Sequence, residues 1–189
     1  MDKVEIGANV FICPMTVTLV GTTVAGRANF MAVGWISRVN ASPPMLAIGI
    51  NKKHYTAEGI KENKAFSINF PKTEMIEKVD YCGLVSGRNE DKSGTFELFY
   101  GRLGSAPMIK DCPLCIECRL HDTVELPTND LFIGGIAGAY TDERYLTDGK
   151  LDPRKIDPLM LTMPDNSYWT LGEKVGNAWS DGRRLISKA

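Results

Sequence analysis

Three of the five cysteines recur at every third position, at Cys112, Cys115 and Cys118. Thiolates at this spacing could hold a metal ion or an iron–sulfur cluster, or could act as redox-active thiols. A strand is expected over residues 114–126, and its alternation would send Cys115 and Cys118 to opposite faces. Because these two thiols could not then share one metal, and no fourth ligand is obvious, we expect structural cysteines. A small cysteine-based metal protein is the less favoured alternative.

The segment Lys52-Lys53-His54-Tyr55-Thr56 lies between an expected strand and an expected helix. Unpaired backbone N–H groups at the start of a helix, together with a threonine hydroxyl and a lysine charge, suit a phosphate group. The competing interpretation is an ordinary helix cap, provided by Thr56, beside solvated lysines. On these five residues alone the ordinary cap is favoured.

The segment Asn29–Ser37 is expected to form one strand, and it carries small or polar side chains at several positions. Such a strand can offer backbone amides and short polar side chains to a flat ligand. The alternative is an ordinary hairpin strand in which Trp35 fills the core. The residues themselves leave both interpretations open.

Several familiar catalytic and nucleotide-binding motifs are absent from the sequence. It contains no G-x-G-x-x-G, P-loop, H-E-x-x-H or G-x-S-x-G pattern. His54 and His121 are the only histidines, so neither a histidine-based metal site nor a Ser-His-Asp triad is favoured.

Length and composition indicate one globular domain with a sizeable core. Of the 189 residues, 43% are hydrophobic and 24% are charged, as is usual in folded proteins. The net charge of -1 gives no basic surplus for nucleic acid, and no apolar run approaches the ~20 residues of a membrane span. No signal peptide is visible, and the odd number of cysteines argues against a disulfide framework, so we expect a cytoplasmic protein.

The candidate residues must be positioned mainly by short strands separated by turns. Alternation and β-branched residues predict strands over residues 15–23, 29–37, 45–51, 65–70, 114–126 and 131–140. Short helices are expected over residues 56–63 and from Thr73 onward. Because the strands do not alternate with long helices, we expect an antiparallel, barrel-like sheet with peripheral helices and not a doubly wound parallel sheet.

Alternation also predicts which side chains share a buried face. The small face of strand 45–51, which carries Gly49, would let a flat ligand approach closely. After Leu151, three prolines predict an irregular tail. The expected apolar faces consist of Leu46, Ile48 and Ile50 on strand 45–51; Met75, Ile76, Val79 and Cys82 on the second helix; and Ile116, Cys118, Leu120 and Val124 on strand 114–126.

Taken together, these segments resemble the flavin reductase-like, FMN-binding split-barrel family, close to its flavoredoxin branch. The resemblance runs from about Pro14 to Leu185 and rests on the order and spacing of short motifs. These motifs are Asn29…Ala32…Trp35-x-Ser37, Ser42-Pro43-Pro44, Lys53-x-x-Thr56, Phe66-Ser67-Ile68-Asn69, Asp91-Lys92, Leu131-Phe132-Ile133-Gly134 and Tyr168-Trp169-x-Leu171-Gly172.

The resemblance implies a mainly β fold with peripheral helices, a six-stranded antiparallel split β-barrel of the FMN-binding type. It implies one domain over residues 1–189 with a C-terminal extension from about residue 152, and a homodimer that binds FMN at the subunit interface. The residues that it assigns to the cofactor are Asn29, Met31, Ala32, Val33, Trp35 and Ser37 for the flavin and ribityl chain; Lys53 and Thr56 for the phosphate, with His54 and Tyr55 close by; Ser86 and Lys92 from a loop; and Tyr168 and Trp169 from the tail, over the ring. No arginine accompanies Lys53, so a bidentate grip on the phosphate is not expected.

The function implied is that of an oxidoreductase that moves electrons from NAD(P)H or a protein donor through FMN to an acceptor. The acceptor would be free flavin, ferric iron or a redox protein partner. Such chemistry needs no catalytic side chain, because the cofactor performs it and the protein supplies position and electrostatics. This agrees with the missing catalytic motifs. A non-enzymatic flavin-binding module remains an alternative of a different class.

Overall fold

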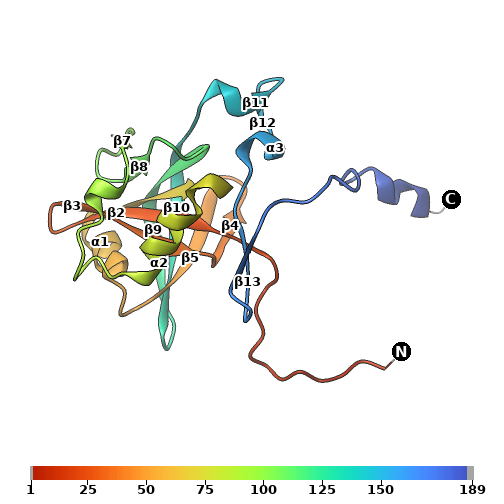
Figure 1. Ribbon diagram of the computed structural model, residues 1–189, viewed down its shortest axis with the longest axis horizontal. Coiled ribbons are helices and arrows are strands. Elements are labelled where there is room, and N and C mark those ends of the chain that lie inside the picture. The colour runs from red at the N-terminus through yellow and green to blue at the C-terminus, as the bar shows by residue number, and fades with distance from the viewer. Residues whose placement is uncertain (1, 187–189) are drawn as a thin grey trace.

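The computed structural model describes residues 2–186 and consists of a β-barrel from which two arms extend. The first arm covers residues 2–14 and the second follows residue 169, and both run away from the barrel on the same side (Figure 1). Within the described residues, no helix is long and apolar enough to cross a membrane. The single domain expected over residues 1–189 includes residues 1 and 187–189, which lie outside the described part.

The barrel is a seven-stranded antiparallel sheet with the order β3-β2-β6-β9-β10-β5-β4. Its strands are β2 (Thr18–Val24), β3 (Arg27–Val33), β4 (Ile36–Asn40), β5 (Met45–Asn51), β6 (Ala65–Phe70), β9 (Leu114–Glu125) and β10 (Asn129–Thr141). The two edge strands β3 and β4 are joined by only two residues, which span less than about 11 Å between flanking Cα atoms. The edges must therefore approach each other, which curls the sheet into a barrel and confirms the expected fold class.

The segment Asn29–Ser37, expected to be one strand, is divided between β3 and β4. Strand β3 pairs with β2, whereas Ile36 of β4 pairs with Ile48 of β5. The chain must pass from one edge of the sheet to the other, and it does so at Gly34 and Trp35. The sheet consequently has seven strands, one more than expected.

Two apolar clusters occupy the two sides of the sheet. Leu19 and Val20, neighbours on β2, belong to different clusters because successive side chains of a strand point to opposite faces. The inner cluster includes Ile48 and Ile50, and the predicted apolar face of β5 is confirmed. The outer cluster includes Phe30, which packs edge-to-face against Phe96 with ring centroids 5.5 Å apart.

The predicted inward position of Val124 on β9 is wrong, and a β-bulge explains the error. Gly134 pairs with Leu120, but Ile133 pairs with Asp122, so His121 is an extra residue in β9. The bulge reverses the alternation beyond it, and Val124 is 41% exposed.

Helix α1 (Tyr55–Asn63) covers one end of the barrel and packs against β2. A Cβ at Gly59 would lie 2.6 Å from the backbone oxygen of Thr23, so glycine is required for this close approach. The predicted cap by Thr56 is wrong. His54 occupies the N-cap without a side-chain hydrogen bond, and Thr56 lies inside the first turn.

Helix α2 (Ile76–Leu84) lies against β3 and is preceded by a 3₁₀ turn, η1 (Thr73–Met75). Met75, Val79 and Cys82 are buried as predicted, but Ile76 is exposed. At about 100° per residue, Ile76 lies to one side of the stripe that Met75, Val79 and Cys82 form, where its side chain reaches the solvent.

The tail after Leu151 is more regular than predicted. Strands β13 (Met160–Thr162) and β14 (Ser167–Trp169) join β1 (Met15–Thr16) in a small sheet of order β1-β13-β14. These strands come from opposite ends of the chain, so no local pattern reveals their pairing. The remaining elements are η2 (Ser93–Thr95), β7 (Leu98–Tyr100), β8 (Pro107–Ile109), η3 (Glu143–Tyr145), β11 (Leu146–Thr147), β12 (Lys150–Leu151), α3 (Pro153–Ile156) and η4 (Asp181–Leu185).

Candidate cofactor-binding site

A cleft of about 250 Å³ opens where the end of β3 meets β5 and the start of β10. Five residues predicted from the sequence meet in it, and four further residues complete its wall. The predicted ones are Met31, Ala32, Val33, Trp35 and His54, and the others are Gly34, Gly49, Asn51 and Asn129. The small face expected on strand 45–51 already indicated Gly49, whereas no pattern in the sequence indicated Asn129.

The floor of the cleft is made of small residues that leave the backbone accessible. Gly49 lies under the ring of Trp35, and a Cβ at Gly49 would be 3.5 Å from that ring. The Gly49 N–H donates to the Trp35 carbonyl oxygen at 2.9 Å, which holds the β3–β4 connection against β5. Trp35 is 51% exposed, so it forms a wall of the cleft and does not fill the core.

Asn29 connects β3 to helix α1 and has an unsatisfied acceptor. Its Nδ2 donates to Thr56 Oγ1 at 2.8 Å. Its Oδ1 is buried and accepts no hydrogen bond from any described residue. A buried acceptor without a partner costs about 1–3 kcal/mol. A Cβ at Gly87 would collide with this Oδ1, so the loop after α2 closes directly over Asn29.

His54 lies at the junction of the cleft and helix α1. Its Nδ1 is 3.1 Å from Met31 Sδ, which fixes the ring beside β3. Burial and, secondarily, the charge of Lys92 lower the pKa of His54 below its usual value of 6.5. The imidazole is therefore neutral at pH 7.

The loop between β5 and α1 presents the start of a helix and a lysine to the solvent. The Lys53 N–H donates to Asn51 Oδ1 at 3.0 Å, which shapes the turn. Lys53 is exposed, and its ammonium forms no ion pair with the residues that the structure describes. An anion at this point would meet both a free ammonium group and the unpaired N–H groups of the first helical turn.

Lys92 is an almost fully buried cation behind Asn29. The residue is only 3% exposed, and its Nζ donates to the Val85 and Cys82 carbonyl oxygens at 3.0 and 3.4 Å. These carbonyls terminate α2, where a positive charge is favourable. Burial lowers the pKa of Lys92. Lys92, Asn29 and Tyr55 line a second cavity of about 10 Å³, room for about one water molecule.

The other predicted residues lie outside the cleft in this single chain. Ser86 is exposed and accepts a hydrogen bond from the Arg88 N–H at 3.3 Å. Ser37 is exposed on β4 and points its hydroxyl to the Arg38 carbonyl oxygen.

The tail pair is also placed away from the cleft. Tyr168 donates from its hydroxyl to Asp80 Oδ1 on α2 at 2.9 Å, and Trp169 Nε1 donates to Thr162 Oγ1 at 2.8 Å. Burial, followed by the hydrogen bond to Asp80, raises the pKa of Tyr168 to about 12. Trp169 is 55% exposed and free to contact another molecule.

Four of the five cysteines, Cys82, Cys112, Cys115 and Cys118, are buried, whereas Cys13 is exposed. Cys115 and Cys118 belong to the two different clusters on opposite sides of the sheet, which confirms the predicted separation. Burial raises the pKa of Cys118 to about 12, so its thiol stays protonated. Within residues 2–186, no three His, Cys, Asp or Glu side chains gather closely enough to hold a metal ion.

Comparison with known proteins gives consistent matches. The sequence pattern of the flavin reductase like domain matches residues 11–161. The crystal structure of flavoredoxin from Methanosarcina acetivorans superimposes with a TM-score of 0.97 and 59% identity, covering 98% of this chain and 100% of that one. Flavoredoxin of Desulfovibrio vulgaris (Miyazaki F) gives a TM-score of 0.88 with 33% identity, covering 96% and 100%.

A curated relative from Aeropyrum pernix, an uncharacterized protein, is 27% identical over 64% of this chain. The match covers 47% of that relative, so the chain spans about half the length of it.

Proposed function

The chain belongs to the flavin reductase-like domain family, and from that premise we propose that it is an FMN-binding redox protein of flavoredoxin type. The family membership confirms the resemblance seen in the sequence. The observation that carries the proposal is the cleft itself, where five residues expected to bind the cofactor meet beside a free lysine at a helix start.

The residues in and beside the cleft fit FMN in shape, polarity and charge. Gly34, Gly49 and Ala32 leave room for a flat ring against the backbone, and Trp35 gives it an aromatic wall. Asn29 lies outside the cleft lining, and its buried, unsatisfied Oδ1 would accept a hydrogen bond from the cofactor once the Gly87 loop that covers it moves aside. The phosphate would be held by Lys53 and by the N–H groups at the start of α1.

When bound, FMN supplies the electron-transfer chemistry, and the side chains of this chain bind and orient it. Because His54 is neutral at pH 7, it adds no second positive charge beside the cofactor. Lys92 brings positive charge behind Asn29 while its ammonium stays bonded to the end of α2. No side chain is required as a nucleophile.

We also propose that a second copy of the chain completes the site. A volume of about 250 Å³ is below the about 300–1,000 Å³ usual for small-molecule pockets, so one chain covers FMN only in part. The two arms expose large apolar side chains that a twofold partner would bury. The most exposed of them are Val4, Ile6, Ile12, Val175, Trp179 and Leu185. Light scattering that gives the mass of a monomer for FMN-loaded protein would contradict this arrangement.

The proposed activity passes electrons from NAD(P)H or a protein donor through bound FMN to an acceptor. A flavoredoxin-type carrier retains FMN and meets a redox protein, whereas a flavin reductase releases reduced flavin. The regular tail and the 59% identity to the Methanosarcina acetivorans flavoredoxin favour the carrier. NAD(P)H oxidation that depends on added free flavin would favour the reductase. Bound FMN that no physiological donor reduces would favour a non-enzymatic flavin-binding module.

The first test is an absorption spectrum of the purified protein after addition of excess FMN and desalting. Retained flavin at about one equivalent per chain is the expected result. Colourless protein that also gains no thermal stability from excess FMN would refute the proposal, since any ligand that binds the folded state must stabilise it.

A further inference from the structure

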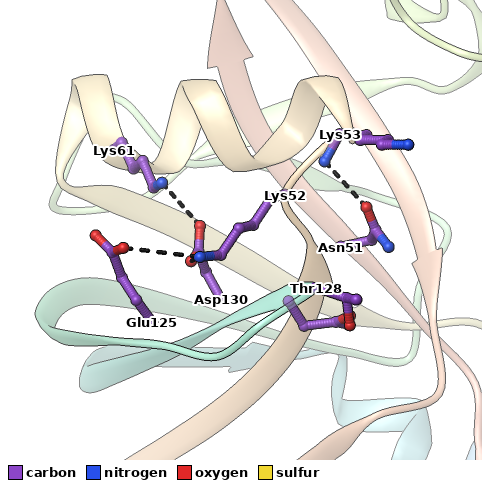
Figure 2. Close-up of polar contacts among 8 residues, drawn as sticks. Asn51, Lys52, Lys53, Lys61, Glu125, Thr128 and Asp130 are labelled. Atoms are coloured by element: carbon purple, nitrogen blue, oxygen red, sulfur yellow. Dashed lines mark hydrogen bonds and ion pairs between the residues drawn. The ribbon is translucent and has the colours of Figure 1, made fainter.

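Asp130, the second residue of β10, is a carboxylate with no exposed surface. Two lysines from different elements converge on it (Figure 2). Lys61 of α1 places its Nζ 2.7 Å from Asp130 Oδ2, and Lys52 of the β5–α1 loop places its Nζ 3.6 Å from Oδ1. Glu125 also approaches Lys52, with its Oε2 at 3.7 Å from the ammonium nitrogen.

A buried ion pair of this kind contributes little to the free energy of unfolding. Taking a carboxylate out of water is costly, and attraction to its partners often only balances that cost. The side chains of Lys61 and Lys52 are 47% and 36% exposed, so they retain part of their hydration while Asp130 has lost all of its own. The best-supported use of buried ionic groups is to specify geometry.

The geometry specified here is that of the β5–α1 loop. The Lys52 N–H donates to the Thr128 carbonyl oxygen at 3.1 Å, just before β10, and its side chain reaches Asp130, so this residue is tied to the turn before β10 and to the start of the strand. Lys53 follows directly and behaves differently. In Figure 2 its side chain extends away from Asp130, on the opposite side of the loop from Lys52.

We propose that Asp130 is a positioning residue for the phosphate of FMN. By bridging Lys52 and Lys61 it fixes the loop at the start of α1 and commits Lys52 to the interior, so that Lys53 is the lysine of this loop that faces the phosphate. This inference rests on the proposed function, because it concerns how the same site holds its cofactor.

Loss of Asp130 would have two opposing effects on FMN. Lys52 would be released and could attract the phosphate, but an exposed lysine is well screened by water and salt. The loop that orients Lys53 and the helix N–H groups would also lose its anchor, and ordered charge-assisted hydrogen bonds are stronger than a screened attraction. The second effect is the larger, so FMN binding weakens.

The test compares FMN with riboflavin, which has the same ring and ribityl chain but no phosphate. Dissociation constants are measured by quenching of flavin fluorescence in the full-length protein. Asp130→Asn is expected to weaken FMN binding by about tenfold and to change riboflavin binding by less than about twofold. Glu125→Gln is the matched control, since it removes the other carboxylate beside Lys52 but not the buried bridge. It is expected to leave both constants unchanged within about twofold.

A double mutant shows whether Asp130 acts through Lys53. In a Lys53→Ala background, Asp130→Asn is expected to weaken FMN binding no further. Equal losses for FMN and riboflavin, tighter FMN binding, or a full tenfold loss in the Lys53→Ala background would each overturn the inference. If Asp130→Asn does not fold, Lys61→Met breaks the same bridge from the helix side, and the same outcomes apply to it.

Failure of this inference is distinguishable from failure of the proposed function. Wild-type protein that binds FMN, with Asp130→Asn binding it equally well, refutes only the role of Asp130. Wild-type protein that binds neither flavin refutes the proposed function, and the positioning role with it.

Discussion

The unsatisfied Oδ1 of Asn29 leads to a prediction in which stability and binding change in different ways. In Asn29→Ala, the cofactor-free protein loses the hydrogen bond to Thr56, worth about 0.5–1.5 kcal/mol. It also loses a buried acceptor without a partner, whose removal returns about 1–3 kcal/mol. These contributions oppose each other and sum to between a loss of about 0.5 and a gain of about 2.5 kcal/mol, so the free energy of unfolding should not fall by more than about 1 kcal/mol.

FMN binding should respond more strongly. If the cofactor supplies the missing donor, wild-type protein regains on binding the about 1–3 kcal/mol that the unsatisfied Oδ1 costs. The Asn29→Ala protein cannot, and its dissociation constant for FMN should rise by about tenfold to a hundredfold.

Asn69 is a matched control on β6, which β2 separates from the strand of Asn29. It is an equally buried asparagine whose amide is fully paired, through Nδ2 to the Leu19 carbonyl oxygen and Ser67 Oγ, and through Oδ1 to the Ile109 N–H. Asn69→Ala leaves these groups without partners and should lower the free energy of unfolding by about 2 kcal/mol or more.

The assay is urea unfolding of cofactor-free protein combined with fluorescence titration with FMN. Asn29→Ala should retain stability and lose binding, whereas Asn69→Ala should lose stability and, where folded, retain binding. If Asn29→Ala is as unstable as Asn69→Ala and binds FMN normally, Asn29 is a structural residue and the reasoning is refuted.

Two further predictions concern the floor of the cleft and the tail. Gly49→Leu should abolish FMN binding measured by fluorescence while Gly49→Ala keeps it, because a Cβ only touches Trp35 at 3.5 Å whereas a longer side chain fills the cleft. Equal binding by both variants would show that the ring lies elsewhere. The pKa of Tyr168 is raised to about 12 in the folded protein, against about 10 when unfolded, so the stability that it contributes below pH 10 should be lost as the pH rises towards 12. Tyr168→Phe should remove this part of the pH dependence in urea unfolding at pH 9 and pH 11.5, and an unchanged dependence would mean that Asp80 does not hold the phenol.

Local patterns were sufficient for most strands of the barrel and for the turns that carry their own signal. Asp148-Gly149 is a sequence typical of a two-residue hairpin turn, and the two residues adopt the positive φ values of 51° and 70° that such a turn requires. Patterns failed where pairing between distant segments decides the structure. Nothing within residues 29–37 indicates that the chain must change edges at Gly34, since that follows only once the sheet closes.

The same limit explains which site residues the sequence missed. Lys53 and Trp35 lie in segments with a recognisable composition, whereas Asn129 reaches the cleft only because it pairs with Asn51 across β10 and β5. That register depends on the whole length of two strands and on two irregularities in the neighbouring pair, β9–β10. A one-residue difference would move a different side chain to the same place.

The register at the start of β10 places both Asn129 in the cleft and Asp130 beside the lysines. Asn129 and Asp130 are consecutive, so their side chains point to opposite faces of the strand. Asn129 lines the cleft, and Asp130 is buried on the side of Phe132, where the lysines of α1 and its preceding loop meet it. A slip of one residue would place an amide among the lysines and a carboxylate in the cleft, beside the phosphate-bearing cofactor that we propose. The order Asn-Asp at this point is therefore required by electrostatics as well as by pairing, because the anion must lie on the face where lysines can neutralise it.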